Sequence, residues 1–325
     1  MFKYVDLFAG IGGFRLALDA SGGECVYSSE INPACREVYR NNFGDEPTGD
    51  IKRIDECSVP DHDILAGGFP CQAFSIAGNK RGFEDTRGTL FFEVLRIAKA
   101  KKPKVLFLEN VKNLVHHDQG RTLEVIKRSL EEQGYHFCWE VLNASDFGLA
   151  QNRERTIIVA SKDKPFDFDP VKKKKFKKKN IKDILERDET SESLDPSSYT
   201  ILDEALLKRQ RSGLIFAGYR NKPFRKSGVR PNTEHLSRVH KQPNRIYHVS
   251  GTHPTLASQE TAGRFWIYDG AKVRKLMIRE CYSLQGFPEN FIISSNKGNA
   301  YRQIGNSVGI PVIKAVAEEI KRQIL

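Results

Sequence analysis

Short apolar runs alternate with amphipathic stretches over the first half of the chain. Apolar runs of strand length occupy residues 4–8, 25–28, 63–66, 105–108 and 156–160. Two intervening stretches, 90–100 and 122–132, instead carry apolar side chains at the spacing of a helix face. Strands that alternate with helices predict a mainly parallel sheet with crossover helices, in the α/β class.

The pattern changes after Lys162. Residues 171–179 read VKKKKFKKK, seven lysines in nine positions, and a polar, acidic and serine-bearing stretch follows to Ser198. Residues 200–277 are irregular and rich in Gly and Arg, with short β-like segments, and residues 310–325 are again helical. The lysine run is typical of a domain boundary or a long connecting loop.

Composition adds a basic surplus to this picture. The 325 residues include 52 Lys and Arg against 41 Asp and Glu, a formal net charge of +11. A surplus of this sign favours a polyanionic partner, nucleic acid first, although an ordinary basic protein has the same balance. The lysine run is equally open to two interpretations. It is either a solvated linker or a flexible arm that contacts phosphates without reading sequence.

Cysteine and histidine usage limits the chemistry further. The six cysteines form no C-x-x-C pair and no zinc-ligand spacing, as expected of reduced thiols in an intracellular protein. No apolar run nears the roughly 18 residues of a membrane span, so we expect a cytoplasmic protein. We predict no metal site, because the clustered histidines lack cysteine or acidic partners at ligand spacing. Phosphate contacts or surface positions are expected for His235, His240, His248 and His253.

A strand that runs into a glycine-rich turn opens the chain. Residues 6–14 read DLFAGIGGF, in which Gly10 and Gly12 permit a tight turn and a close approach of ligand to backbone. Glu30 ends the next strand, where a carboxylate accepts hydrogen bonds from both hydroxyls of a ribose. Asp50 is an acceptor for an exocyclic amine. The alternative is a turn that only packs strand against helix, with Glu30 in solvent. The three features in order favour a nucleoside site.

A cysteine and a carboxylate follow two neighbouring predicted strands. Cys71 lies in Phe-Pro-Cys-Gln after the run 63–66, and Glu109 begins Glu-Asn-Val after the run 105–108. In open α/β sheets this edge is where ligands bind. A thiolate beside an acid suits addition to an electron-poor ring while the acid takes up charge. We therefore predict that Cys71 is a nucleophile and that Glu109 is its acid partner.

With these segments in view, the chain resembles the DNA cytosine-5 methyltransferases, most closely the small bacterial enzymes of restriction–modification systems. The resemblance covers nearly the whole chain apart from residues 165–245. The matching segments are DLFAGIGGF (6–14), Glu30, GDI (49–51), GGFPCQAFS (67–75), ENV (109–111), QNRER (151–155), RECYSLQGFP (279–288) and YRQIGNSV (301–308).

The resemblance implies a fold of two domains. Residues 1–183 plus 295–325 are expected to form a class I S-adenosylmethionine-dependent methyltransferase domain, Rossmann-like, built from both ends of the chain. Residues 184–280 are expected to form a smaller, irregular target-recognition domain. Residues 281–294 would be the hinge region between them.

The resemblance also implies a reaction. Cys71 would add to C6 of a cytosine flipped out of double-stranded DNA, and C5 would take a methyl group from S-adenosyl-L-methionine, leaving S-adenosyl-L-homocysteine. Glu109, carrying or sharing a proton, would bond N3 and the exocyclic amine. Arg153 and Arg155 would donate to O2 and hold the loop that bears Cys71.

Further positions follow from the same motifs. Residues 73–90 resemble the family's loop that closes over DNA. The positions expected to contact DNA are Gln72, Ser75, Arg245 and Thr255. For Arg245, a solvated side chain is the alternative. The cofactor positions are Phe8, Gly10, Gly12, Glu30, Ile31, Asp50, Ile51, Leu90, Asn306 and Val308.

Two departures from the family pattern stand out. Ser283 occupies a position where many relatives have arginine, which puts a structural salt bridge in doubt. Ala77 stands where some relatives have serine, which removes one DNA contact. The resemblance further implies a nucleoid-associated monomer that protects host DNA, with a restriction endonuclease linked genetically rather than bound.

Three other functions fit the sequence less well. The related tRNA methyltransferases carry Cys-Phe-Thr, and none of the six cysteines here precedes Phe-Thr. A non-catalytic relative that only binds nucleic acid would be expected to lack Cys71, Glu109 or the glycine turn. An enzyme that methylates a small molecule leaves the basic second domain unexplained.

Overall fold

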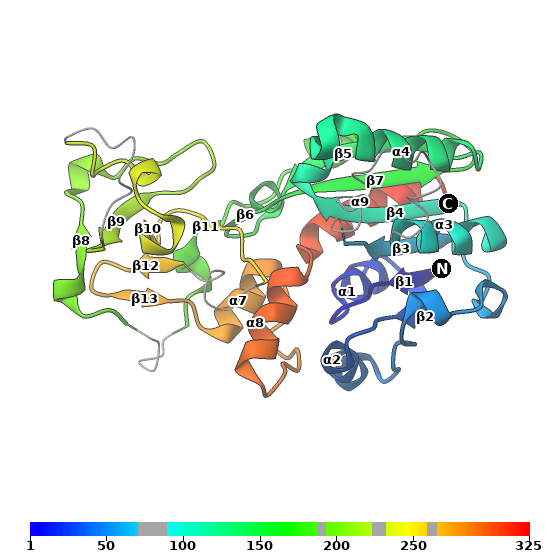
Figure 1. Cartoon of the computed structure of the whole chain (residues 1–325), viewed down its shortest axis with the longest axis horizontal. Helices are drawn as coiled ribbons and strands as arrows, with labels where there is room; N and C mark the ends of the chain where they lie inside the picture. Colours follow the sequence, from blue (N-terminus) through cyan, green and yellow to red (C-terminus); the bar gives the residue numbers. More distant parts are fainter. Residues whose placement is uncertain (71–89, 187–192, 223–231, 259–264) are drawn as a thin grey trace. The chain divides into compact units, whose positions relative to one another are not determined.

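The computed structural model describes residues 1–70, 90–186, 193–222, 232–258 and 265–325 (Figure 1). Residue contacts divide the chain into two compact units. Unit 1 contains residues 1–142, 154–174 and 310–325, so both ends of the chain belong to it, and unit 2 contains residues 143–153 and 175–309. The functional division predicted from the sequence, with its hinge, stays a prediction.

A six-stranded sheet forms the centre of unit 1. Its first four strands run parallel, and β7 is antiparallel to β4. The predicted mainly parallel sheet is confirmed, with β5 as a strand that the sequence analysis missed. In spatial order the strands are β2 (Gly23–Ser29), β1 (Phe2–Leu7), β3 (Ile64–Gly68), β4 (Val105–Val111), β7 (Glu154–Ser161) and β5 (His136–Asn143).

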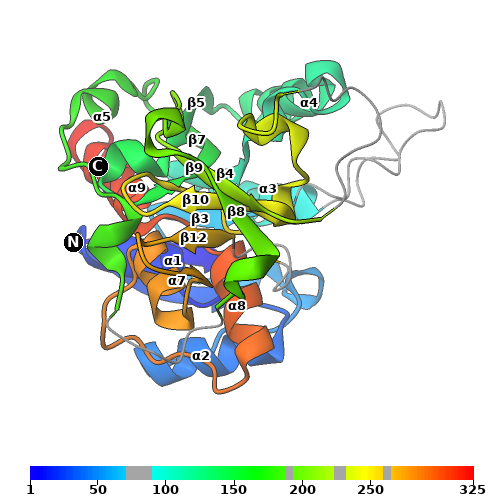
Figure 2. The same ribbon diagram turned by 90° about the vertical axis from the view of Figure 1, so that its left-hand side faces the viewer.

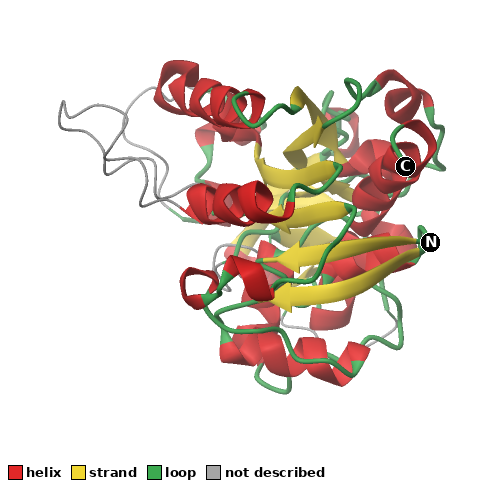
Figure 3. Cartoon of the chain, turned by 90° about the vertical axis from the view of Figure 1, so that its right-hand side faces the viewer, coloured by secondary structure: helices red, strands yellow, loops and turns green. Residues whose placement is uncertain are grey.

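Helices cover both faces of this sheet (Figure 3). On one face, Val5, Leu65 and Leu106 form a buried cluster with apolar residues of α3 (Leu90–Lys101) and α4 (Arg121–Glu131). On the other face, Phe14 of α1 (Gly13–Asp19) packs edge-on against Phe107, and α1 contacts α9 (Ile310–Gln323). Successive strand residues point to opposite faces, and burial on both faces explains the nearly continuous apolar runs. The other helices of unit 1 are α2 (Pro33–Phe43) and α5 (Asp169–Lys173).

Unit 2 is more regular than its sequence suggested, because its short strands join one five-stranded sheet (Figure 2). A small core of Ala217, Ile246, Trp266 and Val273 lies on it. The strands, in spatial order, are β13 (Val273–Lys275), β12 (Trp266–Tyr268), β10 (Arg245–His248), β9 (Phe216–Arg220) and β8 (Tyr199–Ile201). The unit also holds the strand pair β6 (Gln151–Asn152) with β11 (His253–Pro254) and the helices α7 (Ile278–Gln285) and α8 (Lys297–Asn306).

The salt bridge that Ser283 put in doubt is supplied by another arginine. The Arg274 guanidinium donates to both oxygens of Glu280, each at 2.8 Å, and this pair is buried. Glu280 also accepts from the backbone amides of Met277 and Glu186. Four donors therefore satisfy a buried carboxylate without an arginine at position 283.

Two of the four clustered histidines are not at the surface, so that expectation is wrong for them. His240 is buried, and its ring stacks on that of Tyr219 with the two ring centroids 4.1 Å apart. His253 is fully buried, and its Nδ1 lies 2.6 Å from the carbonyl oxygen of Pro254. Periodicity could not reveal the burial of His253, because its strand β11 is only two residues long. Among the described residues, no group of His, Cys, Asp or Glu suited to hold a metal ion is found, and no helix is long and apolar enough to cross a membrane.

The burial of His253 predicts acid sensitivity. Burial lowers the pKa of its imidazole to about 4, from an ordinary value of 6.5. The neutral ring is therefore favoured in the folded chain, and its stabilisation is present above pH 6.5 and lost as the pH falls towards 4. Urea unfolding of a His253→Gln variant should lose less stability between these pH values than the unchanged protein, by at most about 3 kcal/mol. The same substitution at the exposed His235 is the control, and an equal response of both variants would contradict the prediction.

Candidate active site

The register of three parallel strands brings the sequence motifs to one edge of the sheet. Leu7 of β1 pairs with Gly67 of β3, which pairs with Leu108 of β4. The glycine turn after β1, the segment that leads to Cys71 and the carboxylate Glu109 therefore begin at the same level. Strand β1 lies between β2 and β3, so the winding of the sheet reverses there. Such a reversal is where open α/β sheets bind their ligands.

The glycine turn has a strained and closely packed backbone. Phe8 has a φ of +55°, unusual for a residue with a side chain, and Gly10 and Gly12 have φ of +56° and +87°. A Cβ atom on Gly12 would lie 2.2 Å from the ring of Phe43, at the end of α2. Glycine is required at position 12 both by backbone angle and by this contact.

Glu30 is fixed at the end of β2 by the turn itself. Its Oε2 accepts from the amide of Gly10 at 2.9 Å, and its Oε1 accepts from the amide of Asn32 at 2.8 Å. The carboxylate is half-buried. Each oxygen has two lone pairs, so the carboxylate retains capacity for two further donors.

A cavity of about 580 Å³ is lined by Ile31, the residue after Glu30, and by the segment that contains Asp50. Ile31 is 66% exposed and Asp50 is half-buried, whereas Ile51, next to Asp50 in the chain, is buried. One oxygen of Asp50 accepts from the amide of Lys52 at 3.0 Å. An exposed apolar side chain and a carboxylate beside a fixed acid suit an adenosine, whose base is flat and apolar with an amine at its edge.

Asp6 is a residue that the sequence analysis did not single out. It lies on β1 two residues before Phe8, is fully buried, and neither carboxylate oxygen has a hydrogen-bond partner in the described part of the chain. Burial raises the pKa of Asp6 to about 8. A proton on this carboxyl at neutral pH follows from its lack of solvent and donors.

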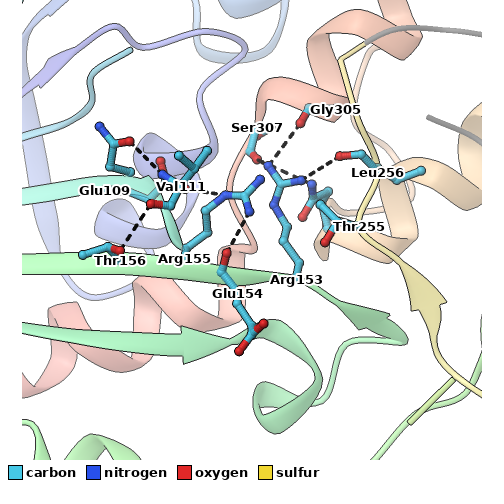
Figure 4. Close-up of polar contacts among 12 residues, drawn as sticks. Glu109, Val111, Arg153, Glu154, Arg155, Thr156, Thr255, Leu256, Gly305 and Ser307 are labelled. Carbon is cyan, nitrogen blue, oxygen red and sulfur yellow. Dashed lines mark hydrogen bonds and ion pairs between the residues drawn. The ribbon is translucent and has the colours of Figure 1, made fainter. Parts of the chain in front are cut away.

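Glu109 is held by an arginine of the neighbouring strand (Figure 4). Arg155 of β7 places its Nε 2.9 Å from Oε1 of Glu109, and its Nη1 donates to the carbonyl of Glu154. Both side chains of the ion pair are less than a fifth exposed. Gly68 pairs with Glu109, and a Cβ there would lie only 3.1 Å from Oε2. The glycine leaves room for the carboxylate above the end of β3.

Asn110 ties the two strand ends together, a role that the sequence analysis missed. Its side-chain amide donates to the carbonyl of Phe69 at 2.8 Å, and its oxygen accepts from the amide of Val111. Phe69 is itself buried against Phe91 of α3. Asn110 thus fixes the chain two residues before Cys71. The predicted Cys71, Gln72, Ser75 and the closing loop lie outside the described residues, apart from Leu90, the half-buried first residue of α3.

Arg153, in unit 2, is buried, and its guanidinium donates hydrogen bonds to backbone carbonyls (Figure 4). Its Nη1 donates to the carbonyl of Leu256, and its Nη2 donates to the carbonyls of Gly305 and Ser307. These three acceptors lie more than 100 positions away in sequence, so spacing alone gave no sign of them. In the structure, Arg153 therefore holds together the backbone at Leu256 and the backbone on both sides of Asn306. Its contact with cytosine stays a prediction.

Other predicted positions of unit 2 take part in local contacts. Arg245 donates through Nε to the carbonyl of His240, and the Thr255 hydroxyl donates to the carbonyl of Asn152. Asn306 ends α8 and is exposed, whereas Val308 is buried. Their predicted contacts with DNA and cofactor stay predictions.

The family is decided by comparison with known sequences. The profile of the C-5 cytosine-specific DNA methylases matches residues 2–322. The chain belongs to this family. It is a DNA cytosine-5 methyltransferase, and the expectation from the motifs is confirmed.

Two curated relatives of this methylase are similar over almost their whole length. Type II methyltransferase M.HhaI of Haemophilus parahaemolyticus is 42% identical over 98% of this chain and 94% of its own. Type II methyltransferase M.NlaX of Neisseria lactamica is 41% identical over 99% and 96%. A crystal structure of S. pombe Dnmt2 methyltransferase superposes with a TM-score of 0.69 at 20% identity, covering 100% of this chain and 99% of that one. At that identity the likeness shows the fold alone.

Gly12→Ala tests the packing of the glycine turn. The substitution should cost more than the strain of a left-handed residue, because the new methyl group meets the Phe43 ring. Gly44→Ala is the matched control, since Gly44 has a φ of +83° with nothing within 4 Å of a Cβ. We expect a loss of about 3 kcal/mol in unfolding free energy at position 12 and about 1 kcal/mol at position 44. Equal losses would mean that Phe43 does not constrain the turn.

Asn110→Ala tests whether the tether to Phe69 positions the nucleophile. Loss of the tether should lower the rate of methyl transfer at saturating substrate by about 10²-fold, because small displacements of a reacting group are costly. Affinity for the methyl donor should be retained. Asn113→Ala, at an exposed position of the same strand connection, is the control. An unchanged rate in Asn110→Ala would remove the positioning role.

Proposed function

We propose that this methylase transfers a methyl group from S-adenosyl-L-methionine to C5 of a cytosine within a specific double-stranded DNA sequence. The observation that carries the proposal is the shared register of β1, β3 and β4. It brings the glycine turn after β1, the segment before Cys71 and the Glu109–Arg155 pair to one edge of one sheet. A methyl donor and a reacting base need this proximity.

The cofactor residues of unit 1 fit the donor named here. S-adenosyl-L-methionine supplies an electrophilic methyl group on a sulfonium and leaves as S-adenosyl-L-homocysteine. Glu30 would accept from the ribose hydroxyls, Asp50 from the adenine amine, and Ile31 would cover the base. Phe8, Gly10, Gly12, Ile51 and Leu90 would shape this side of the pocket, with Asn306 and Val308 proposed to complete it.

Cytosine C5 needs activation before it can accept a methyl group. The Cys71 thiolate would add to C6, which makes C5 electron-rich, and the added charge would move towards N3. Glu109 would accept from the exocyclic amine and supply a proton to N3. Arg155, already bonded to Glu109, would orient the carboxylate and present its remaining N–H groups to O2. Loss of the C5 proton and elimination of Cys71 would restore the enzyme.

The base must leave the helix for this chemistry, since C6 is covered in a stacked duplex. Gln72 and Ser75 are proposed to contact DNA beside the vacated position, and Arg245 and Thr255 are proposed to contact it from unit 2. The type II relatives suggest the biological role. The enzyme would act as a cytoplasmic monomer that protects host DNA from a separately encoded endonuclease.

Cys71→Ser tests the nucleophile. A hydroxyl is far less ionised and less nucleophilic than a thiol, so transfer of labelled methyl groups to DNA should fall below detection. Cys57→Ser is the control, because Cys57 is an exposed free cysteine outside the matched segments. Sequencing of DNA from expressing cells, by bisulfite conversion, would supply the methylated sequence for the assay. Retained turnover in Cys71→Ser would exclude this thiol as the nucleophile.

A trapped adduct tests covalent catalysis directly. A duplex that carries 5-fluorocytosine at the methylated position cannot lose a proton from C5, so the bond to Cys71 should persist. We expect a complex that survives denaturing electrophoresis with unchanged protein and with Cys57→Ser, but not with Cys71→Ser. An active enzyme that forms no such complex would contradict the mechanism.

A further inference from the structure

The lysine run is the strongest feature that the reaction leaves unused. Its seven lysines contribute seven of the chain's eleven surplus positive charges. The sequence left a solvated linker and a phosphate-contacting arm open. The structure separates the run into two parts with different surroundings.

Two lysines in the first part of the run are neutralised by carboxylates of unit 1. The Nζ atom of Lys172 lies 2.9 Å from a carboxylate oxygen of Glu140 and 3.0 Å from one of Asp169. The Nζ atom of Lys174 lies 2.9 Å from a carboxylate oxygen of Glu318 and 3.4 Å from one of Glu319. These two lysines form ion pairs within the protein at the end of α5, so we do not expect them to bind a partner.

The second part, in unit 2, keeps its charge. Four lysines, which we call the lysine strip, are exposed and form no ion pair with any described residue: Lys175, Lys177, Lys178 and Lys179. The nearest acidic residue further along the chain, Asp183, is turned to the amide of Asn180 at 2.7 Å. Four like charges within five positions repel one another, which favours a partner that is itself a polyanion.

The lysine strip is anchored at both ends rather than loose. The Phe176 ring packs on Phe147 at 5.3 Å, and the backbone of this segment lies against Gly148. Beyond the strip, Ile181 is fully buried and its amide donates to the carbonyl of Gly251. Holding the chain at both sides lowers the entropy lost when the lysines engage a ligand.

We propose that the lysine strip binds the phosphate backbone of DNA, independently of sequence and apart from the residues that act on cytosine. DNA is the favoured occupant because the enzyme acts on DNA and because each strand carries closely spaced negative charges, one for about every 3.4 Å of helix axis. Lysine suits this contact, since it acts as a point charge without the planar fork that base reading uses. The strip would lengthen the DNA footprint and raise affinity at low salt.

The test is the salt dependence of DNA binding by a Lys177→Gln/Lys178→Gln/Lys179→Gln variant, measured by fluorescence anisotropy with long duplexes. Each lost phosphate contact should reduce the slope of log Kd against log salt by about 0.9. The rise in Kd between about 50 and 200 mM salt should therefore be about 40-fold smaller than for unchanged protein. A duplex without the methylated sequence should give the same reduction.

A matched control removes the same charge elsewhere. Lys99, Lys164 and Lys297 are also exposed, and their triple change to Gln should leave the slope close to that of the unchanged protein. An equal reduction in both variants would overturn the proposal, because net charge and not the strip would be responsible. An unchanged slope in the strip variant, with loss of binding to phosphatidylserine vesicles instead, would overturn it in favour of a membrane surface. Binding is measured without turnover, so the result does not depend on the proposed reaction.

Discussion

Parallel pairing of β1, β3 and β4 is the constraint on which the rest of this methylase depends. The hydrogen-bond ladder aligns Leu7, Gly67 and Leu108, so the three strands that precede the motifs end at the same level although they are far apart in sequence. A parallel ladder requires crossover connections, which places helices on both faces and buries the strands. The same burial makes the sheet rigid where chemistry requires fixed positions.

Close backbone approach is the second recurring element. Gly12 accommodates the Phe43 ring, and Gly68 accommodates the carboxylate of Glu109. Polar side chains then hold the neighbouring groups in place. The Asn110 amide donates to the Phe69 carbonyl, and Arg155 forms an ion pair with Glu109. The described part of the reactive edge is therefore supported by neighbouring strands. Arg153 has the same function in unit 2, where it binds three carbonyls from two distant segments.

Charge is distributed with a similar division of roles. Buried ion pairs such as Arg274–Glu280 satisfy all their partners and stabilise the fold locally. The first lysines of the run join α5 to neighbouring carboxylates. The lysine strip, in contrast, keeps its charge in solvent. The formal surplus of the chain does not by itself indicate where DNA is bound.

The sequence alone determined five of the six strands of the sheet in unit 1, the helices α3, α4 and α9, and the need for glycine after β1. It also supplied the residues that we propose to react. These depend on local periodicity and on local sterics, which neighbouring residues carry with them. Only the tertiary structure decided the antiparallel direction of β7, the burial of His240 and His253, and the choice of Arg274 as partner for Glu280. It also decided that Arg155 bonds Glu109 while Arg153, two positions away, bonds backbone carbonyls. These outcomes depend on contacts between distant segments, for which spacing along the chain carries no signal.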